Sequence, residues 1–310
     1  MSMINTERIS SGIEGIDVLL QGGIIKNSVN SIVGSSGTGK TTFALAYLYQ
    51  GLLNGDHTLY LSFEETPSKL IGEAEALGID IRSLTNDAED LIHLVESEKI
   101  VEFMTNILPA LAQKLKHRNI KHTRIVLDPL TPILWEFPSE KEQRKVLTKI
   151  YQHLSSLGTV LQTIEEPNAF GQTDIGATET RVPIYLSDSV IHIQNLGLGG
   201  KYNRTCKIIK SRKTPHHEGI YPLNFVNGPG IVIDTSSVET VEVDPMVYDI
   251  RYQELMKKVK ELSQDKDPKK RIIAQIAKNL LGEREKRDTR QNMELVEVLT
   301  DKHVLQEVRK

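Results

Sequence analysis

The sequence has 310 residues, of which 39% are hydrophobic and 25% charged, so it can bury a core and is neither collagen-like nor wholly disordered. No stretch approaches the roughly 18 consecutive apolar residues of a membrane span, and residues 1–10 lack the apolar centre of a signal peptide. Its single cysteine, Cys206, cannot form an intramolecular disulfide, so we expect a soluble cytoplasmic protein with no membrane partner.

Charge is distributed unevenly along the chain. Residues 1–247 hold 22 Lys and Arg against 29 Asp and Glu, whereas residues 248–310 hold 16 against 12. This change predicts a folded domain over residues 1–245 and a C-terminal extension over residues 246–310. Because an acidic domain lacks the positive field that binding to a phosphate backbone requires, any nucleic acid is expected at the extension.

Strands and helices alternate through the first part of the folded domain. Apolar runs typical of strands occupy five segments, at residues 31–33, 58–63, 91–95, 123–127 and 159–164. Apolar residues at helical spacing occupy four segments, at residues 44–52, 70–77, 101–115 and 141–157. This alternation is typical of an α/β fold with a largely parallel central sheet flanked by helices.

The pattern changes after residue 164. A long loop rich in Gly, Thr and Asn is predicted over residues 165–188. Four strands without intervening helices are predicted next, at residues 189–194, 204–211, 221–226 and 230–233. They predict an antiparallel C-terminal extension of the sheet at one edge.

The extension beyond Pro245 is predicted to be charged and helical. Apolar residues from Tyr248 to Leu262 are spaced alternately by four and three, as in a short coiled-coil seam. A second helix is expected to begin with Asp267 as its N-cap and Pro268 as its first residue. A weaker third helix is predicted from about residue 292 to the end. The apolar stripe and its lysines suit an unidentified protein partner or another subunit.

A phosphate-binding loop lies between the first predicted strand and helix of the sheet. Residues 34–41 have the sequence GSSGTGKT, which matches G-x-x-x-x-G-K-[ST]. Its glycines let backbone N–H groups surround anionic oxygens, and Lys40 supplies charge for the β- and γ-phosphates of ATP. The Thr41 hydroxyl is an expected ligand of Mg²⁺. The predicted nucleotide contacts are Ser36, Gly37, Thr38, Gly39, Lys40, Thr41 and Thr42.

Acidic residues at two other strand ends complete this chemistry. The apolar run at residues 124–127 ends in Asp128, which is expected to hold the Mg²⁺ shell together with Thr41. Glu64 and Glu65 follow the strand at residues 58–63, where one of them would orient or deprotonate the attacking water. By chemistry alone, this pair equally suits a solvated acidic strand end.

Several motifs along the domain together resemble a known family. They are SSGIEGID at residues 10–17, LLQGGI at 19–24, the phosphate loop, SFEET at 62–66, LSDSVI at 186–191, KSR at 210–212 and GIYPL at 219–223. In this order they resemble the RecA-like ATPase domain of the KaiC family over residues 7 to about 240. The resemblance implies a RecA-like P-loop fold with one ATPase domain, and it does not extend beyond Pro245.

The resemblance also implies roles for individual residues. Glu64 and Glu65 correspond to the paired catalytic glutamates, with Glu64 as the base that activates water. Lys210 and Arg212 fall on a Lys-x-Arg that reaches the neighbouring subunit's γ-phosphate. Two more residues fall on nucleotide positions of that interface, Thr214 and His216. Without the resemblance, Lys210 and Arg212 would be assigned to a solvated strand face.

Two places in the chain depart from the family pattern. Pro129 stands where a small polar residue usually follows the Asp, which puts polar contacts there in doubt. Ile184 and Tyr185 align with the Ser/Thr pair that autophosphorylates in the clock protein's second domain. Autokinase activity of that type is therefore not expected.

The predicted function is a slow, Mg²⁺-dependent ATP hydrolase that acts as an oligomeric switch, with active sites shared between subunits. A homo-oligomer is implied, and the resemblance favours a hexamer. The alternative is a RecA- or RadA-like paralogue that binds single-stranded DNA in recombination or repair. It ranks lower because residues 165–188 hold one cation, Arg181, beside five acids. A kinase or transcriptional regulator that acts through the tail is a third class.

Overall fold

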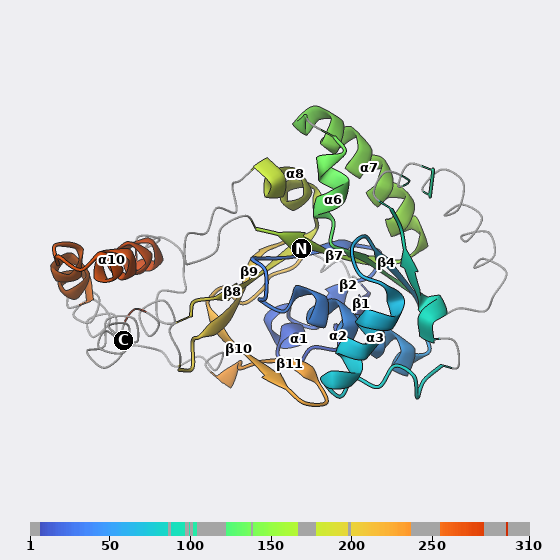
Figure 1. Cartoon of the computed structure of the whole chain (residues 1–310), viewed down its shortest axis with the longest axis horizontal. Helices are drawn as coiled ribbons and strands as arrows, with labels where there is room; N and C mark the ends of the chain where they lie inside the picture. The colour runs from blue at the N-terminus through green and yellow to red at the C-terminus, as the bar shows by residue number, and fades with distance from the viewer. Residues whose placement is uncertain are drawn as a thin grey trace, which may run out of the picture.

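The computed structural model of this chain describes residues 7–85, 88–96, 99, 102–103, 122–137, 139–166, 178–197, 200–236, 255–281 and 296 (Figure 1). The main sheet of the described strands has the order β11-β10-β9-β8-β3-β7-β6-β4-β5. These strands are β3 (Val29–Gly34), β4 (His57–Ser62), β5 (Ile92–Leu94), β6 (Thr123–Asp128), β7 (Thr159–Glu165), β8 (Ser189–Asn195), β9 (Arg204–Ser211), β10 (Tyr221–Val226) and β11 (Gly230–Ile233). Every predicted strand is present, with ends shifted by at most two residues.

Strand direction divides this sheet into two parts. β3 pairs in parallel with β7 and β8, and β6 pairs in parallel with β7 and β4. β8, β9, β10 and β11 pair antiparallel with one another in chain order. The predicted parallel sheet with an antiparallel edge is therefore confirmed, and it fits a RecA-like P-loop fold.

Helices cover both faces of the sheet. The helices are α1 (Ile16–Leu19), α2 (Lys40–Asn54), α3 (Pro67–Ala76), α6 (Thr131–Trp135), α7 (Glu140–Leu157) and α8 (Thr178–Leu186). Figure 1 shows α1, α2 and α3 on one face and α6, α7 and α8 on the other. A 3-10 helix (Ala88–Leu91) and a small sheet of β1 (Arg8–Ile9) with β2 (Ile24–Ile25) complete the described domain.

Alternating side chains of the strands form a hydrophobic core on each face. Ile32 and Val126 pack into the core that contains α2 and α3, whereas Val33 and Ile125 pack into the core that contains α7. Successive residues of a strand point to opposite faces, so strands covered on both sides are continuously apolar. This explains why short apolar runs located the strands.

Two helical predictions have different outcomes. A loop was expected over residues 165–188, but α8 lies within them. The prediction missed this helix because Pro183 lies inside it, and proline normally breaks a helix. The predicted helix over residues 101–115 lies almost entirely outside the described residues.

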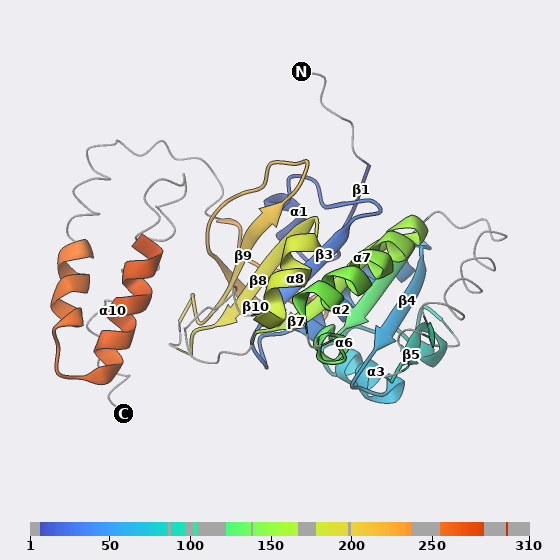
Figure 2. The same ribbon diagram turned by 90° about the horizontal axis from the view of Figure 1, so that it is seen from above.

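The C-terminal extension is helical over residues 255–263 and in α10 (Pro268–Leu281). The Asp267 carboxylate accepts a hydrogen bond from the backbone N–H of Lys269 at 2.9 Å, so the predicted N-cap is present. Leu255 and Val259 pack against Ala274 and Ala277 of α10, which Figure 2 shows beside the preceding helix. The predicted boundary near residue 245 lies outside the described residues. Within the described part of the chain, no helix has the length and hydrophobicity needed to cross a membrane.

Candidate nucleotide-binding site

The phosphate loop, residues 34–41, connects the end of β3 to the start of α2. Gly37 and Gly39 have positive φ angles of 74° and 105°, which L side chains rarely adopt. A Cβ at Gly34 would lie 2.4 Å from the carbonyl oxygen of Ile193. A Cβ at Gly39 would lie 2.6 Å from the ring of Phe225. The loop can therefore pass this close to its neighbours only as glycine.

Lys40 places its ammonium group inside this loop. Its Nζ donates to the carbonyl oxygens of Gly34 and Ser35, each at 2.9 Å. Burial lowers the pKa of Lys40, while the negative charges of four carboxylates act in the opposite direction. Those carboxylates belong to Glu165, Asp128, Glu64 and Glu166. The structure therefore gathers one cation and several acids at the C-terminal edge of the parallel strands.

Asp128 ends β6 and is buried, with 4% of its surface exposed. The hydroxyls of Tyr60 and Thr163 both donate to its carboxylate. β7 lies between β3 and β6, so the strand of Asp128 is next but one to the strand of the phosphate loop. β6 ends at Asp128, immediately before Pro129.

The two glutamates after β4 have different surroundings. Burial raises the pKa of Glu64, and the charges of Glu165, Asp128 and Glu65 raise it further, whereas the Lys40 charge lowers it. Glu65 instead lies 2.5 Å from Nζ of Lys69, one helical turn away. Glu64 is therefore the member of the pair whose charge interacts with both Lys40 and Asp128.

Lys210 and Arg212 lie at the end of β9 that is distant from the phosphate loop. Ser211 pairs with Ser189, which lies beside the start of β3, whereas the loop follows the end of β3. A strand rises about 3.3 Å per residue, so these two places are more than roughly 10 Å apart. The structure thus places both cations away from their own phosphate loop.

The C-terminal carbonyl groups of α8 hold these two cations. Lys210 Nζ donates to the Ile184 carbonyl at 2.7 Å, and Arg212 donates to the Tyr185 carbonyl at 2.8 Å. This matches the preference of cations for the negative end of a helix. Burial, together with the charge of Arg212, lowers the pKa of Lys210 to about 8.

The remaining predicted interface residues follow Arg212 in the chain. The Thr214 hydroxyl accepts a hydrogen bond from the guanidinium of Arg8. Burial lowers the pKa of His216. The backbone N–H of His217 donates to the Leu19 carbonyl at 2.8 Å, so this segment packs beside the N-terminal residues.

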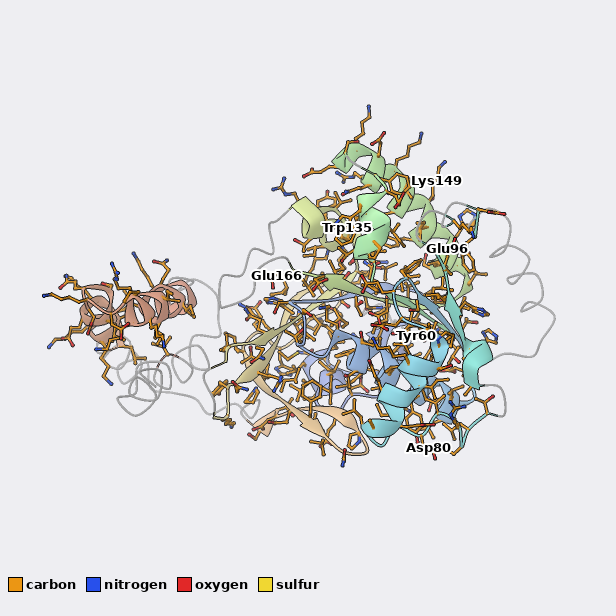
Figure 3. The ribbon with its side chains drawn as sticks, in the orientation of Figure 1. Tyr60, Asp80, Glu96, Trp135, Lys149 and Glu166 are labelled. Carbon is orange, nitrogen blue, oxygen red and sulfur yellow. The ribbon has the colours of Figure 1, made fainter. Side chains whose placement is uncertain are left out.

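Two acids near the phosphate loop, Glu165 and Glu166, were not predicted as site residues. The backbone N–H of Glu166 donates to the Gly34 carbonyl at 3.0 Å, so the end of β7 contacts the loop directly. Glu166 and His192 are both buried, with 2.9 Å between Oε2 and Nε2 (Figure 3 labels Glu166). Glu165 and Glu166 were counted only as acids of a loop. The available signal was a Glu-Glu pair directly after a strand, as at Glu64 and Glu65.

These groups fit a nucleoside triphosphate and a divalent cation. The loop leads into the N-terminus of α2, whose positive end attracts phosphate groups. Carboxylate and hydroxyl oxygens are the ligands that Mg²⁺ prefers, and Asp128 and Thr41 offer one of each. The arrangement can bind a phosphoanhydride, neutralise its charge and place a base beside it.

Comparison with known proteins gives concordant matches. A family model described as "ATPase: KaiC" matches residues 9–238. The circadian clock protein KaiC3 of Synechocystis sp. is 30% identical over 79% of this chain and 48% of its own length. The circadian clock oscillator protein KaiC of Thermostichus vulcanus is 28% identical over 74% of this chain and 45% of its own length. The chain thus spans about half the length of the curated relatives it matches.

Proposed function

The chain belongs to the KaiC ATPase family, and we propose that it is an Mg²⁺-dependent ATP hydrolase whose active sites are shared between the subunits of a homo-oligomer. The observation that carries the proposal is the separation of two sets of charged groups. Lys40, Asp128 and Glu64 interact at one edge of the sheet, whereas Lys210 and Arg212 lie at the other end of the strands.

Substrate binding is assigned to the phosphate loop. Backbone N–H groups of residues 36–42 would surround the phosphates, with Lys40 directed at the β- and γ-groups. Thr41 and Asp128 would hold Mg²⁺, which neutralises charge on the phosphate oxygens when bound. The position of the loop at the N-terminus of α2 supports this assignment.

Hydrolysis is assigned to Glu64. The oxygen of a water molecule attacks the γ-phosphorus, the bond to the β-phosphate oxygen breaks, and ADP leaves with that bonding pair. The water proton passes to the Glu64 carboxylate, which its raised pKa makes a better acceptor than an ordinary glutamate. Glu65 is the weaker candidate because Lys69 pairs with it.

A cation from a neighbouring subunit would stabilise the charge that grows on the γ-phosphate. Lys210 and Arg212 are too far along β9 to serve their own phosphate loop, so we assign them to the neighbour's site, with Thr214 and His216 beside them. Such head-to-tail contacts form a ring when the rotation between subunits closes, and the family resemblance favours six subunits. In a single subunit, the carbonyls of α8 hold the two cations.

The single-stranded DNA alternative gains little support from residues 165–188. Arg181 is the one cation of residues 165–188, and its guanidinium lies 3.0 Å from the Glu140 carboxylate. Because this charge is already paired on the surface, it adds little to a site for a phosphate backbone.

A subunit-mixing experiment tests the shared site. Arg212→Ala subunits should bind ATP yet hydrolyse it poorly, and Lys40→Ala subunits should fail to bind ATP. Their mixture should regain activity, because some interfaces then join an intact phosphate loop to an intact Arg212. Lys149→Ala, at an exposed position of α7, is the control that should stay active alone (Figure 3). If mixed assemblies form but remain as inactive as their components, the shared-site proposal fails.

A further inference from the structure

Two hydroxyl groups from the strands on either side of Asp128 meet its carboxylate. The sheet order places β6 between β7 and β4. Thr163 of β7 donates its hydroxyl hydrogen to Oδ1 of Asp128, and Tyr60 of β4 donates to Oδ2. Each carboxylate oxygen therefore has a hydroxyl partner from a different strand.

The Tyr60 hydroxyl approaches Asp128 from the face of the sheet that carries α2. Tyr60 lies opposite Val126, and Asp128 is two residues further along the same strand, so all three share this face. Tyr60 and Val126 both belong to the core that packs against α2. Since α2 begins at the phosphate loop, the carboxylate is oriented on the side where nucleotide is proposed to bind.

All three residues are buried within the domain (Figure 3 labels Tyr60). Asp128 is 4% exposed, and Tyr60 and Thr163 are 0% exposed. A carboxylate in such surroundings needs hydrogen-bond donors. Each carboxylate oxygen has two lone pairs, so each keeps one acceptor position after receiving a hydroxyl.

We propose that Tyr60 and Thr163 are positioning residues that fix the Asp128 carboxylate for the Mg²⁺ shell of a bound nucleotide. The proposal rests on the proposed function of Asp128 at this site. Free rotation of a carboxylate spreads its oxygens over several directions, whereas two hydroxyls on opposite sides hold one orientation. Loss of such an outer hydrogen bond typically lowers metal affinity by about 10–100-fold.

Four conservative variants of the full chain test this assignment. Tyr60→Phe and Thr163→Val each remove one hydroxyl from Asp128. Tyr47→Phe and Thr58→Val are the matched controls, since both residues are buried in the same domain. The Tyr47 hydroxyl donates to a backbone carbonyl at 3.2 Å, and the Thr58 hydroxyl has no hydrogen-bond partner among the described residues.

The measurement is calorimetric binding of ADP across a series of MgCl₂ concentrations, which requires no turnover. The Mg²⁺ midpoint is the Mg²⁺ concentration that gives half of the maximal enhancement of ADP binding. It should rise about 10–100-fold in Tyr60→Phe and Thr163→Val. ADP affinity in chelator should stay unchanged in both, and the controls should keep the wild-type midpoint. A Tyr60→Phe midpoint equal to that of Tyr47→Phe would overturn the proposal.

Asp128→Asn separates this inference from the proposed function. If Asp128→Asn leaves the Mg²⁺ midpoint unchanged, the assignment of Asp128 to Mg²⁺ fails, and the positioning role fails with it. If Asp128→Asn raises the midpoint while both hydroxyl variants do not, only the positioning role fails. Thermal unfolding in chelator identifies a variant that does not fold. In that case Thr163→Val, which is nearly isosteric, decides the question.

Discussion

Glu64 and Glu65 are adjacent in sequence but differ in electrostatic environment. Burial, with Glu165 and Asp128 nearby, raises the pKa of Glu64. The Glu65 carboxylate is instead paired with Lys69 at 2.5 Å. A general base works best when its pKa lies close to the working pH, so the raised pKa favours Glu64 as the group that accepts the water proton.

Replacing Glu64 should therefore affect turnover and not nucleotide binding. We expect Glu64→Gln to keep ATP affinity and to lower the rate of ADP formation by about 10²–10⁴-fold. In the wild type, the rate should fall as pH drops through the pKa of Glu64, because the protonated acid cannot accept a proton. That pKa lies above the usual glutamate value. Glu65→Gln is the control, and its rate should still fall at low pH as in the wild type. An unchanged rate in Glu64→Gln would contradict the assignment of Glu64 as the base.

The sequence located the phosphate loop but not the partners of its acids. A loop motif is local, so Lys40 and Thr41 are visible as a pattern within eight residues. The hydroxyls on Asp128 come from β4 and β7, and their meeting depends on strand order and register. No spacing in the sequence records that register. Tyr60 therefore looked like any buried strand residue.

At the scale of elements, the strands were predictable and the order of the sheet was not. Short apolar runs mark strands that are covered on both faces, as at β6 and β7. Sequential strands often lie side by side, but here β7 and β6 lie between β3 and β4. α8 was missed because Pro183 interrupts its pattern, although its last carbonyls hold Lys210 and Arg212.

A buried ion pair joins α2 to β6 at the end of the sheet opposite the phosphate loop. Arg124 is 1% exposed, and its Nε lies 2.8 Å from the Asp56 carboxylate just after α2. The same guanidinium donates to the Ser10 carbonyl at 2.8 Å and lies over the Tyr47 ring. One side chain thus links the N-terminal segment, α2 and the central sheet.

Removing the acidic partner should leave an uncompensated charge inside the protein. We expect Asp56→Ala to lower the free energy of unfolding by about 3–5 kcal/mol, measured by chemical denaturation. The control is Glu75→Ala, which breaks the pair between Glu75 and Arg82, whose side chains are 43% and 51% exposed. That change should cost about 0–1 kcal/mol. Equal losses in the two variants would show that the buried pair adds nothing beyond a surface pair.

At the scale of the whole assembly, Lys210 makes the proposed shared site sensitive to alkaline pH. Burial lowers its pKa to about 8. ATP hydrolysis should therefore decline as pH rises through about 8 or somewhat above, since a neighbour's phosphate would raise this pKa. Lys210→Arg should remove the decline because arginine keeps its charge.

The same titration should not weaken the fold. Between about pH 8 and the usual lysine value, the unfolded chain binds more protons at this residue than the folded chain. The contribution of Lys210 to folding stability therefore rises with pH in that window. Unfolding curves beside the rate profile distinguish loss of charge from loss of structure. An alkaline limb that persists in Lys210→Arg would point to another group.

We propose that the C-terminal extension contacts a neighbouring subunit. Its helices pack on each other through Leu255, Val259, Ala274 and Ala277, and no residue of this cluster belongs to the two described cores of the domain. Ile272 is 51% exposed on α10. Lysines of this segment suit an acidic surface, and residues 1–247 carry an excess of acids.

A chain that ends at Asp244 should therefore fold and bind ATP, but assemble more weakly or into a smaller oligomer than the full chain. Light scattering after size exclusion, with and without ATP and Mg²⁺, measures this. Because the proposed contact is between opposite charges at a surface, added salt should also reduce the full chain's assembly toward that of the shortened chain. Identical assembly of both chains would argue against this role. If, in addition, only the full chain bound labelled single-stranded DNA at low salt, the extension would be a nucleic-acid arm, and the DNA-binding function would outrank the switch.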